Sequence, residues 1–476
     1  MNIRFRDLID QTYYFPTEEF TLDNSNLLFH GVPLMELVEK YGSPLKFTYL
    51  PKISQNIGLA KKWFAAAMEK HRYDGKYYYC YCTKSSHFRY VMQEALKNDI
   101  HIETSSAFDI DIVENLKKEG LVKDDTYVIC NGFKREAYVD NVARLINNGQ
   151  VNCIPILDNY EELPLLSEKI ETPFKVGIRI ASEEEPKFEF YTSRLGIGYK
   201  DIVPFYESQV RDHPGVELKM LHFFVDSGIK DTLYYWGEFQ KALKLYVELK
   251  KESVNLDSFN LGGGFPIRNH LGFEYDYEYM INEIVKNVKE SCEKENVKEP
   301  DLFTEFGRYT VGEAGAIIFK VLEQKQQNDT ENWYIINNSL MNTIPDAWSI
   351  HEKFILLPIN KWNHEYGRVN IGGISCDHSD YYNSEDLNQE VLLPTYSPED
   401  KEPLYLGFFH TGAYQDSISG YGGIKHCLIP SPKHVIIDRD EKGNIIVNSE
   451  ISVDMDVSNS VVINSKLNGS GSVKYS

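Results

Sequence analysis

A lysine that follows an aromatic run is the first candidate for chemistry in this chain. The run from Tyr77 to Cys82 predicts a strand that continues to Lys84, just before a polar turn. Side chains alternate along a strand, so Tyr78, Cys80, Cys82 and Lys84 are expected on one face. An amine that leaves a crowded strand end into a pocket is well placed to form a Schiff base. An isolated lysine at a strand end is more often solvated or ion-paired, so a catalytic role for Lys84 needs support from other residues of the chain.

Two later stretches carry groups that suit a phosphorylated ligand. The run Leu261-Gly262-Gly263-Gly264 follows a predicted strand, and its bare backbone N–H groups can approach an anion closely. The next predicted strand ends in Glu305-Phe306-Gly307-Arg308, which offers a carboxylate and a guanidinium fork for a phosphate. Taken alone, the glycine run is explained by a tight turn about as well as by a phosphate site.

The spacing of the strands predicts the architecture that positions these groups. Strand-like runs alternate with helical patterns at 77–84, 100–104, 126–130, 151–157, 174–180, 218–225, 258–261 and 302–305. Eight such units favour a (β/α)8 TIM barrel, whose active site lies at the carboxyl ends of its strands, often with a phosphate site after strands seven and eight. A doubly wound open sheet is the main alternative, because the number of strands does not by itself close a barrel.

The pattern changes after about residue 318, where short strands and Gly or Pro turns replace the helices. We therefore expect an α/β chain with a C-terminal β domain. The expected parts are an N-terminal segment packed on the β domain (1–45), the cofactor-binding barrel (46–318), the β domain (319–455) and a loosely held tail (456–476).

Composition narrows the classes of protein. The 476 residues carry a formal net charge of −21, which argues against a nucleic-acid partner. No apolar run is long enough to span a membrane, and the charged N-terminus lacks the apolar core of a signal peptide. The seven cysteines include no metal-type CxxC pair, so we expect no metal site and a reduced, cytoplasmic location.

Together, the candidate groups match one cofactor. Pyridoxal 5'-phosphate needs an amine to hold its aldehyde, a carboxylate beside its ring nitrogen and donors for its phosphate. Lys84, Glu305 and the glycine run with Arg308 supply these three. A carboxylate at the ring nitrogen keeps that nitrogen protonated, so that the ring can accept electrons.

The ordered motifs also resemble a known family. They are similar to the pyridoxal-phosphate decarboxylases of basic amino acids, which have an alanine-racemase-like barrel, and most similar to the biosynthetic arginine decarboxylase branch. The similar stretches are Cys130-Asn131-Gly132-Phe133-Lys134, Leu221-His222-Phe223, Leu261 to Gly264, Glu305 to Arg308, Ser339-Leu340, Pro345-Asp346-Ala347-Trp348, Ser375-Cys376-Asp377, Gly407-Phe408-Phe409 and Gly412-Ala413-Tyr414-Gln415. The Pro-Asp-Ala-Trp and Gly-Ala-Tyr-Gln stretches are the most specific to that branch.

The resemblance implies a role for each matching residue. It implies that Lys84 holds the cofactor as an aldimine, that Glu305 pairs with the ring nitrogen, and that Cys376 donates a proton to the substrate carbon. Asp377 would bind the cationic end of the substrate. The implied cofactor contacts are Phe224, Ser227, Gly263, Gly264, Arg308 and Tyr414. Because Cys376 and Asp377 reach into the neighbouring subunit's site in the family, the resemblance implies a homodimer with shared sites, and larger assemblies stay open.

Several residues depart from the family pattern. Phe224 stands where the family has a histidine stacked on the cofactor ring, and it can stack but cannot form a hydrogen bond. Asp226 replaces a glycine near the phosphate, and Thr83 replaces the valine or isoleucine that usually precedes the lysine. Arg179, at the end of the fifth predicted strand, could lie near the ring or pair with Glu305.

The leading functional hypothesis is decarboxylation of L-arginine to agmatine and CO2 for polyamine biosynthesis. Related substrates are alternatives: ornithine, lysine, citrulline, carboxynorspermidine or diaminopimelate. Asp377 argues against diaminopimelate, whose distal carboxylate would need a cation. A non-catalytic regulatory homologue is the alternative of another class, and the presence of Lys84, Glu305, Arg308 and Cys376 argues against it.

Overall fold

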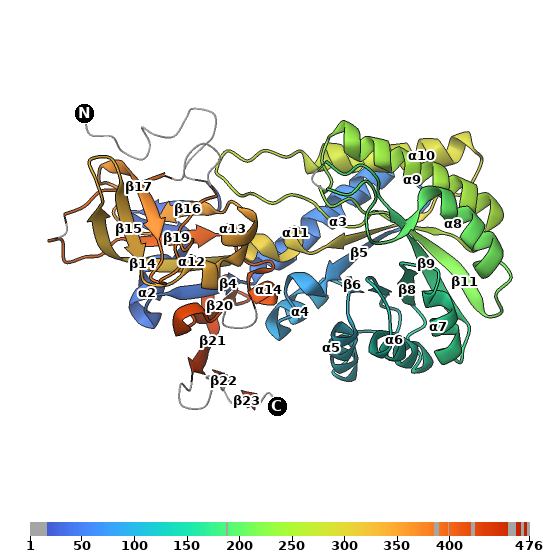
Figure 1. Ribbon diagram of the computed structural model, residues 1–476, viewed down its shortest axis with the longest axis horizontal. Coiled ribbons are helices and arrows are strands. Elements are labelled where there is room, and N and C mark those ends of the chain that lie inside the picture. Colours follow the sequence, from blue (N-terminus) through green and yellow to red (C-terminus); the bar gives the residue numbers. More distant parts are fainter. Residues whose placement is uncertain are drawn as a thin grey trace. The chain divides into compact units, whose positions relative to one another are not determined.

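The computed structural model describes residues 17–186, 189–384, 390–397, 399–419, 424–455, 463–467 and 471–473. The chain forms two compact units, which can be followed by their labels in Figure 1. The barrel unit consists of Ile53–Pro266 and Tyr275–Thr310. The sheet unit consists of Met1–Lys52, Ile267–Glu274 and Val311–Ser476.

Eight parallel strands close the barrel. They are β5 (Tyr77–Cys82), β6 (His101–Thr104), β7 (Val128–Cys130), β8 (Cys153–Leu157), β9 (Phe174–Ala181), β11 (Val216–His222), β12 (Ser258–Asn260) and β13 (Asp301–Phe306). Each strand pairs with the next in this order, β13 pairs with β5, and β9 pairs with both β8 and β11. The ring of pairings confirms the predicted TIM barrel and excludes the open sheet. A two-residue strand, β10 (Ile197–Gly198), adds to β9 outside the ring.

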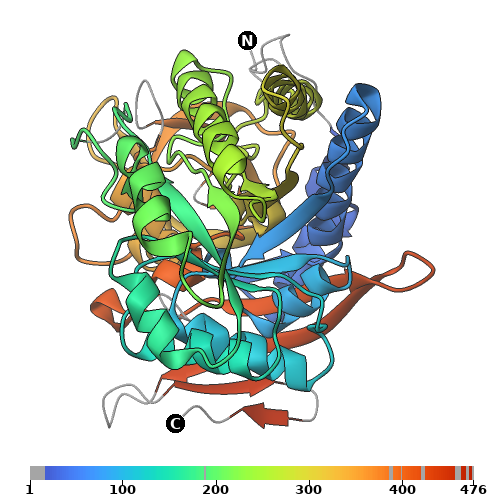
Figure 2. The ribbon, with the colours of Figure 1, turned by 90° about the vertical axis from the view of Figure 1, so that its right-hand side faces the viewer.

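Helices surround the barrel strands, as Figure 2 shows. They are α3 (Pro51–His71), α4 (Arg89–Leu96), α5 (Ala107–Lys118), α6 (Ala137–Asn147), α7 (Glu162–Lys169), α8 (Tyr199–Phe205) with the π-turn η2 (Tyr206–Val210), α9 (Leu233–Glu252), α10 (Tyr277–Lys294) and α11 (Arg308–Val311). Apolar side chains from the strands fill the barrel interior: Cys80, Ile129, Ile154, Ile156, Met220 and Phe303. This packed centre makes the barrel rigid, so the strand ends hold polar groups at fixed positions.

Two predicted strands end at least two residues earlier than expected. β5 stops at Cys82, and Thr83–Ser85 forms the 3₁₀ turn η1, so Lys84 leaves from a turn and not from a strand. Hydroxyl groups close this turn, since Ser85 Oγ donates to the Cys82 carbonyl (2.8 Å) and Thr83 Oγ1 donates to the Glu103 carbonyl (3.1 Å). Such side-chain hydrogen bonds compete with strand pairing. β11 likewise ends at His222, so residues 223–225 belong to a loop.

The sheet unit is built around an eleven-stranded sheet. Its strands are β4 (Leu45–Tyr49), β14 (Gly315–Gln326), β15 (Asn332–Ile336), β16 (Ile355–Pro358), β17 (Tyr366–Gly372), β18 (Val391–Pro394), β19 (Tyr405–Phe409), β20 (Lys433–Arg439), β21 (Ile445–Met455), β22 (Ile463–Leu467) and β23 (Gly471–Val473). Short helical segments connect them: η3 (Gly312–Ala314), α12 (Leu340–Thr343), α13 (Pro345–Ile350), α14 (Gln415–Ser419) and η4 (His426–Leu428).

The N-terminal residues that the structure describes belong to the sheet unit. They form a small antiparallel sheet, β1 (Phe20–Asp23), β2 (Asn26–Phe29) and β3 (Val32–Pro33), followed by α2 (Leu34–Tyr41). Phe20 and Phe29 are fully buried in one apolar cluster with Phe409. In the tail expected from residue 456, the described residues 463–467 and 471–473 extend β21 as antiparallel strands, and the other tail residues lie outside the described part.

None of the helices that the structure describes is both long enough and apolar enough to cross a membrane.

Candidate active site

An ion pair links the candidate lysine to the neighbouring strand. Lys84 Nζ lies 3.0 Å from Oε2 and 3.1 Å from Oε1 of Glu103, at the carboxyl end of β6. The Glu103 side chain has no exposed surface, whereas the Lys84 side chain is 44% exposed. Asn131, which follows β7, donates a further hydrogen bond to Glu103 Oε1 (3.0 Å). The amine is therefore held at the barrel end but can still be reached from outside.

Three donors hold the carboxylate of Glu305. Its Oε1 accepts a hydrogen bond from Asn260 Nδ2 (2.7 Å), and its Oε2 accepts one from Asn131 Nδ2 (2.9 Å). His222 Nε2 lies 3.0 Å from the same Oε2. Burial alone would raise the pKa of Glu305, but His222, the Lys84 charge and Asn131 lower it to about 2. Glu305 is thus an anion at neutral pH, deep in the barrel end.

The glycine run packs against a second loop with no room for side chains. Gly264 (φ +106°) and Gly228 (φ +83°) face each other, and a Cβ on Gly264 would lie 2.6 Å from the Gly228 Cα. A Cβ on Gly263 would lie 2.2 Å from the carbonyl oxygen of Glu305. Glycine is therefore required here for close backbone approach. The two loops offer a surface of bare backbone beside Glu305, which suits a phosphate group.

One of the predicted phosphate donors already donates its hydrogen bond to a carboxylate. The backbone N–H of Ser227 donates to Glu185 Oε1 at 2.5 Å. Burial raises the pKa of Glu185, and the hydrogen bonds from Ser227 oppose this shift. For Ser227 N–H to bind a phosphate, the Glu185 carboxylate must move away. Asp226, the acidic residue next to Ser227 in the loop after β11, is exposed.

Arg179 lies over the phenyl ring of Phe224. Its guanidinium carbon is 5.4 Å from the ring centroid, which is the distance of a cation–π contact. Its Nε is buried and has no hydrogen-bond partner among the described residues. Burial lowers the pKa of Arg179, and the charges of Asp158, Glu305 and Glu103 counteract this. Both Arg179 and Phe224 therefore belong to the same end of the barrel as Glu305.

The remaining predicted site residues divide between the two units. Arg308 begins α11 immediately after β13 in the barrel unit. Cys376, Asp377 and Tyr414 belong to the sheet unit. Cys376 is exposed and its Sγ lies 3.3 Å from Sγ of Cys427, whose hydrogen bond and charge raise the pKa of Cys376.

Four residues of the barrel site were missed by the sequence analysis as site residues: Glu103, Asn131, His222 and Asn260. Each is polar and lies at or just after the carboxyl end of an observed strand, and for all but His222 the predicted strand ends there too. That position was the available signal, because the ends of all barrel strands meet at one face.

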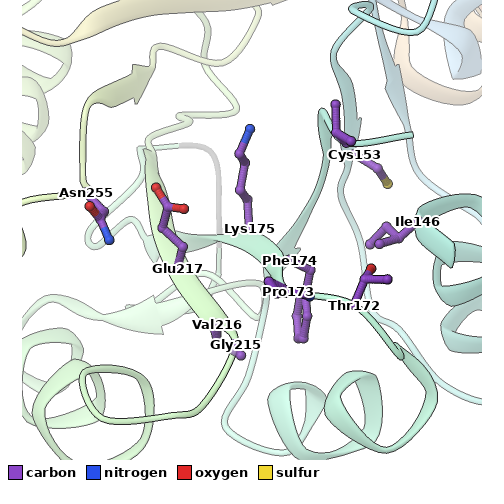
Figure 3. A pocket seen from close by; sticks show the side chains of 11 residues that line it. Ile146, Cys153, Thr172, Pro173, Phe174, Lys175, Gly215, Val216, Glu217 and Asn255 are labelled. Atoms are coloured by element: carbon purple, nitrogen blue, oxygen red, sulfur yellow. The ribbon is translucent and has the colours of Figure 1, made fainter. Parts of the chain in front are cut away.

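A cavity opens at the opposite end of the barrel. Its volume is about 380 Å³, and its lining includes Phe174 and Val216, the first residues of β9 and β11. Figure 3 shows Lys175 and Glu217 among the side chains around it. The amino-terminal face of a TIM barrel ordinarily serves stability, so we assign the chemistry to the carboxyl ends.

The polar groups at the carboxyl ends fit pyridoxal 5'-phosphate. Lys84 offers a reachable amine, and the Glu305 anion suits a protonated ring nitrogen. The glycine loops offer the bare backbone that a phosphate needs. His222 Nδ1 and Arg179 Nε are buried polar atoms without partners among the described residues, as expected of a site shaped for a polar ligand.

Comparisons with known proteins agree with this chemistry. The chain is 21% identical to the biosynthetic arginine decarboxylase of Prochlorococcus marinus (strain AS9601), over 89% of this chain and 83% of that protein. The crystal structure of the biosynthetic arginine decarboxylase SpeA from Campylobacter jejuni matches with a TM-score of 0.76 and 20% identity, over 92% of this chain and 88% of that one.

The fold matches a decarboxylase of another substrate equally well. The diaminopimelate decarboxylase of M. jannaschii, in complex with L-lysine, matches with a TM-score of 0.75 and 18% identity, over 90% of this chain and 94% of that one. The family described as "Pyridoxal-dependent decarboxylase, pyridoxal binding domain" matches residues 60–312, more than half of the chain. The protein therefore belongs to the pyridoxal-dependent decarboxylases.

Proposed function

We propose that this decarboxylase acts on L-arginine and releases agmatine and CO2, as a step of polyamine biosynthesis. The observation that carries the decarboxylase chemistry is the buried Glu305 anion, fixed by three donors at the barrel end that also holds Lys84. The choice of arginine is supported by the arginine decarboxylases that this chain resembles over most of its length.

In this proposal Lys84 carries the cofactor. When bound, pyridoxal phosphate supplies an electron sink for the electron pair that the departing CO2 leaves behind. Lys84 Nζ must lose its proton before it can act as a nucleophile, and Glu103 Oε2, 3.0 Å away, is an acceptor within reach. Glu103 would therefore hold that proton, which makes it a partner of Lys84 in the chemistry.

Glu305 would keep the ring nitrogen protonated throughout the reaction. Its pKa of about 2 means that it remains an anion when it accepts a hydrogen bond from a protonated ring. Gly263, Gly264, Arg308, Ser227 and Tyr414 would bind the phosphate, and Phe224 would pack on the ring face. Ser227 can take part only after the Glu185 carboxylate leaves its N–H.

Cys376 and Asp377 would complete the site of the neighbouring subunit in a homodimer. The exposed Cys376 thiol would donate a proton to the substrate carbon after CO2 has left. Asp377 would bind the guanidinium of arginine, whose planar fork matches a carboxylate. Ornithine and lysine carry a single ammonium instead, and the distal carboxylate of diaminopimelate would be repelled.

The choice of substrate can be tested by measuring CO2 release from a panel of amino acids. We expect arginine to give a higher kcat/KM than ornithine, lysine, citrulline, carboxynorspermidine or diaminopimelate. Asp377→Asn should lower kcat/KM for arginine by the equivalent of about 2–5 kcal/mol in activation free energy. The reason is that the desolvated guanidinium of the substrate would lose its charged partner. Asp329→Asn changes an exposed carboxylate of the same unit and should have no effect. Preference for neutral citrulline would show that the substrate's distal group is not a cation.

Borohydride reduction tests the cofactor-carrying residue separately. Reduction should fix the cofactor to Lys84, as read by peptide mapping, and Lys84→Ala should abolish this label. Lys76→Ala, at an exposed lysine before β5, is the control and should keep it. A label on another lysine would contradict the assignment, and an unlabelled, cofactor-free protein would favour a regulatory homologue.

A further inference from the structure

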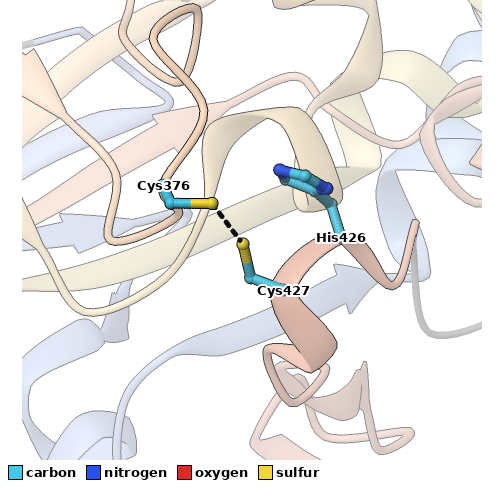
Figure 4. Close-up of side chains that lie close together, drawn as sticks. All are labelled: Cys376, His426 and Cys427. Atoms are coloured by element: carbon cyan, nitrogen blue, oxygen red, sulfur yellow. Dashed lines mark hydrogen bonds between the residues drawn. The ribbon is translucent and has the colours of Figure 1, made fainter.

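Three side chains that commonly ligate metals meet on the sheet unit. Cys376, His426 and Cys427 each offer one ligand atom, and these atoms all lie within 4.8 Å of one another. Figure 4 shows Cys376 on a loop, with His426 and Cys427 on the short turn η4 facing it. Cys376 and Cys427 are 51 positions apart in sequence, so no short spacing motif predicts that they lie together.

One nitrogen of the imidazole in this cluster has no hydrogen-bond partner among the described residues. It is the buried Nε2 of His426. The nearest carboxylate oxygen, Asp377 Oδ2, is 3.8 Å away, which is too far for a hydrogen bond. A buried polar atom without a partner is costly, and a bound ion can remove that cost by accepting the free lone pair of the nitrogen.

The backbone holds one thiol in a strained position. Cys427 has φ 55° and ψ 17°, and the next residue, Leu428, has φ 53°. Two successive left-handed residues that are not glycine are costly and gather at functional sites. This bend places Cys427 Sγ 3.3 Å from Cys376 Sγ.

We propose that Cys376, Cys427 and His426 bind a thiophilic divalent metal ion, zinc above all. Zinc prefers thiolate sulfur and imidazole nitrogen in a tetrahedral arrangement, with Zn–S bonds of about 2.3 Å. Two thiolates on such an ion lie about 3.8 Å apart, so the two sulfur atoms need only separate slightly. Binding releases the two thiol protons to solvent, and Asp377 or water supplies the fourth ligand.

Metal binding would also inhibit the enzyme, and this consequence rests on the proposed function. A Cys376 thiolate bound to zinc has no proton to donate to the substrate carbon. The free thiol returns when a chelator removes the ion. The cluster would thus make the reaction sensitive to zinc, although the metal takes no part in catalysis.

Direct binding tests the site without substrate. The holoenzyme, reduced with a phosphine that does not bind zinc, is titrated with Zn²⁺ against a chromophoric chelator and, separately, with Co²⁺. We expect one ion per chain and the ligand-field and thiolate charge-transfer bands of tetrahedral cobalt. Cys427→Ser and His426→Ala should each weaken zinc binding by at least about tenfold. His378→Ala removes an exposed imidazole two residues from Cys376 and should not change binding.

Activity is then measured with the same proteins. Zinc should inhibit the wild type reversibly, and Cys427→Ser should need at least about tenfold more zinc for the same inhibition. The site is wrong if Cys427→Ser binds zinc like the wild type, if cobalt shows no thiolate band, or if the two thiols form a disulfide and no metal binds. If the chain binds zinc tightly but decarboxylates no amino acid, the proposed metal site is supported and the proposed function is wrong.

Discussion

His222 Nε2 lies 3.0 Å from Oε2 of Glu305, and both side chains are almost completely buried. Phe224 stands where the resemblance predicts a stacking histidine, and His222, in the similar stretch Leu221-His222-Phe223, supports the carboxylate from the end of β11. Because an anionic carboxylate can only accept, Nε2 carries the proton of this hydrogen bond. In the proposed function, His222 would act on the ring nitrogen only through Glu305, as a positioning residue.

Replacement of His222 should make the anionic form of Glu305 less stable. His222→Leu removes a hydrogen-bond donor that lowers the pKa of Glu305, so this pKa rises and Glu305 becomes protonated at higher pH as the solution is acidified. We expect kcat to fall by about 10–100-fold, with the acid limb of the pH profile moved to higher pH.

Two further variants separate this effect from damage to the fold. His222→Gln keeps an amide donor and should recover part of the rate, whereas His213→Leu, at a partly exposed histidine of the barrel unit, should leave it unchanged. Glu305→Gln should keep the cofactor but lose about 10²-fold or more in rate. An unchanged pH profile in His222→Leu would show that His222 does not set the charge of Glu305.

The proposed dimer makes a complementation prediction. Lys84→Ala and Cys376→Ala should each be inactive, because each lacks one half of every site. A mixed dimer has one site with both residues intact, so equal mixing with full subunit exchange should restore about a quarter of wild-type activity. The measurement is CO2 release after mixing, with subunit exchange followed by differently tagged chains. Proven exchange without recovery would place both residues in the site of one chain.

A buried ion pair lies in the barrel unit. Lys134 Nζ lies 3.4 Å from Glu162 Oε2, neither side chain is exposed, and the ammonium also donates to the carbonyl of Gly132 (2.8 Å). Lys134→Met would leave the Glu162 charge buried and unpaired, so we expect a loss of about 3–5 kcal/mol in the free energy of unfolding, measured by urea denaturation.

The double variant Lys134→Met with Glu162→Gln should recover part of that loss, because no unpaired charge remains. Lys169→Met, at an exposed lysine of α7, should change stability by less than about 0.5 kcal/mol. Equal stability of the single and double variants would show that the unpaired charge is not the cause.

A buried histidine makes the stability of the sheet unit depend on pH. His410 Nε2 lies 2.7 Å from Glu19 Oε1, and its Nδ1 lies 2.5 Å from the carbonyl oxygen of Arg268. Both neighbours are acceptors, so the ring carries two protons and a positive charge. Burial opposes the charge, but Glu19 raises the pKa of His410 above 6.5, and His410 with His30 lowers the pKa of Glu19 well below 4.5 despite its burial.

The two shifts define the pH range of greatest stabilisation. The raised pKa of His410 stabilises fully below 6.5, and this contribution is lost as pH rises through the folded-state value. The lowered pKa of Glu19 stabilises fully above 4.5, and this contribution is lost as pH falls through its folded-state value. We expect the Tm difference between wild type and His410→Gln to be greatest between pH 4.5 and 6.5. A difference that stays constant from about pH 4 to about pH 9 would contradict a charged His410.

The sequence alone determined the alternation of eight strands with helices and most of the strand positions, whereas closure into a barrel was decided by the pairing of β13 with β5. Alternating helical and strand patterns depend on local burial, so the eight strands could be placed and Lys84 and Glu305 could be assigned to strand ends. It did not determine where β5 ends, because the hydrogen bond from Thr83 to the carbonyl of Glu103, which competes with strand pairing, joins residues 20 positions apart.

The partners of the site residues were decided only by the tertiary structure. The donors to Glu305 come from the ends of β7, β11 and β12, separated from it by 174, 83 and 45 residues, and only closure of the barrel brings them together. The same holds for Cys376 and Cys427, which are 51 residues apart and meet because a strained turn faces a loop. Local sequence patterns record which face of an element is buried, but a contact between distant elements depends on how the whole chain packs.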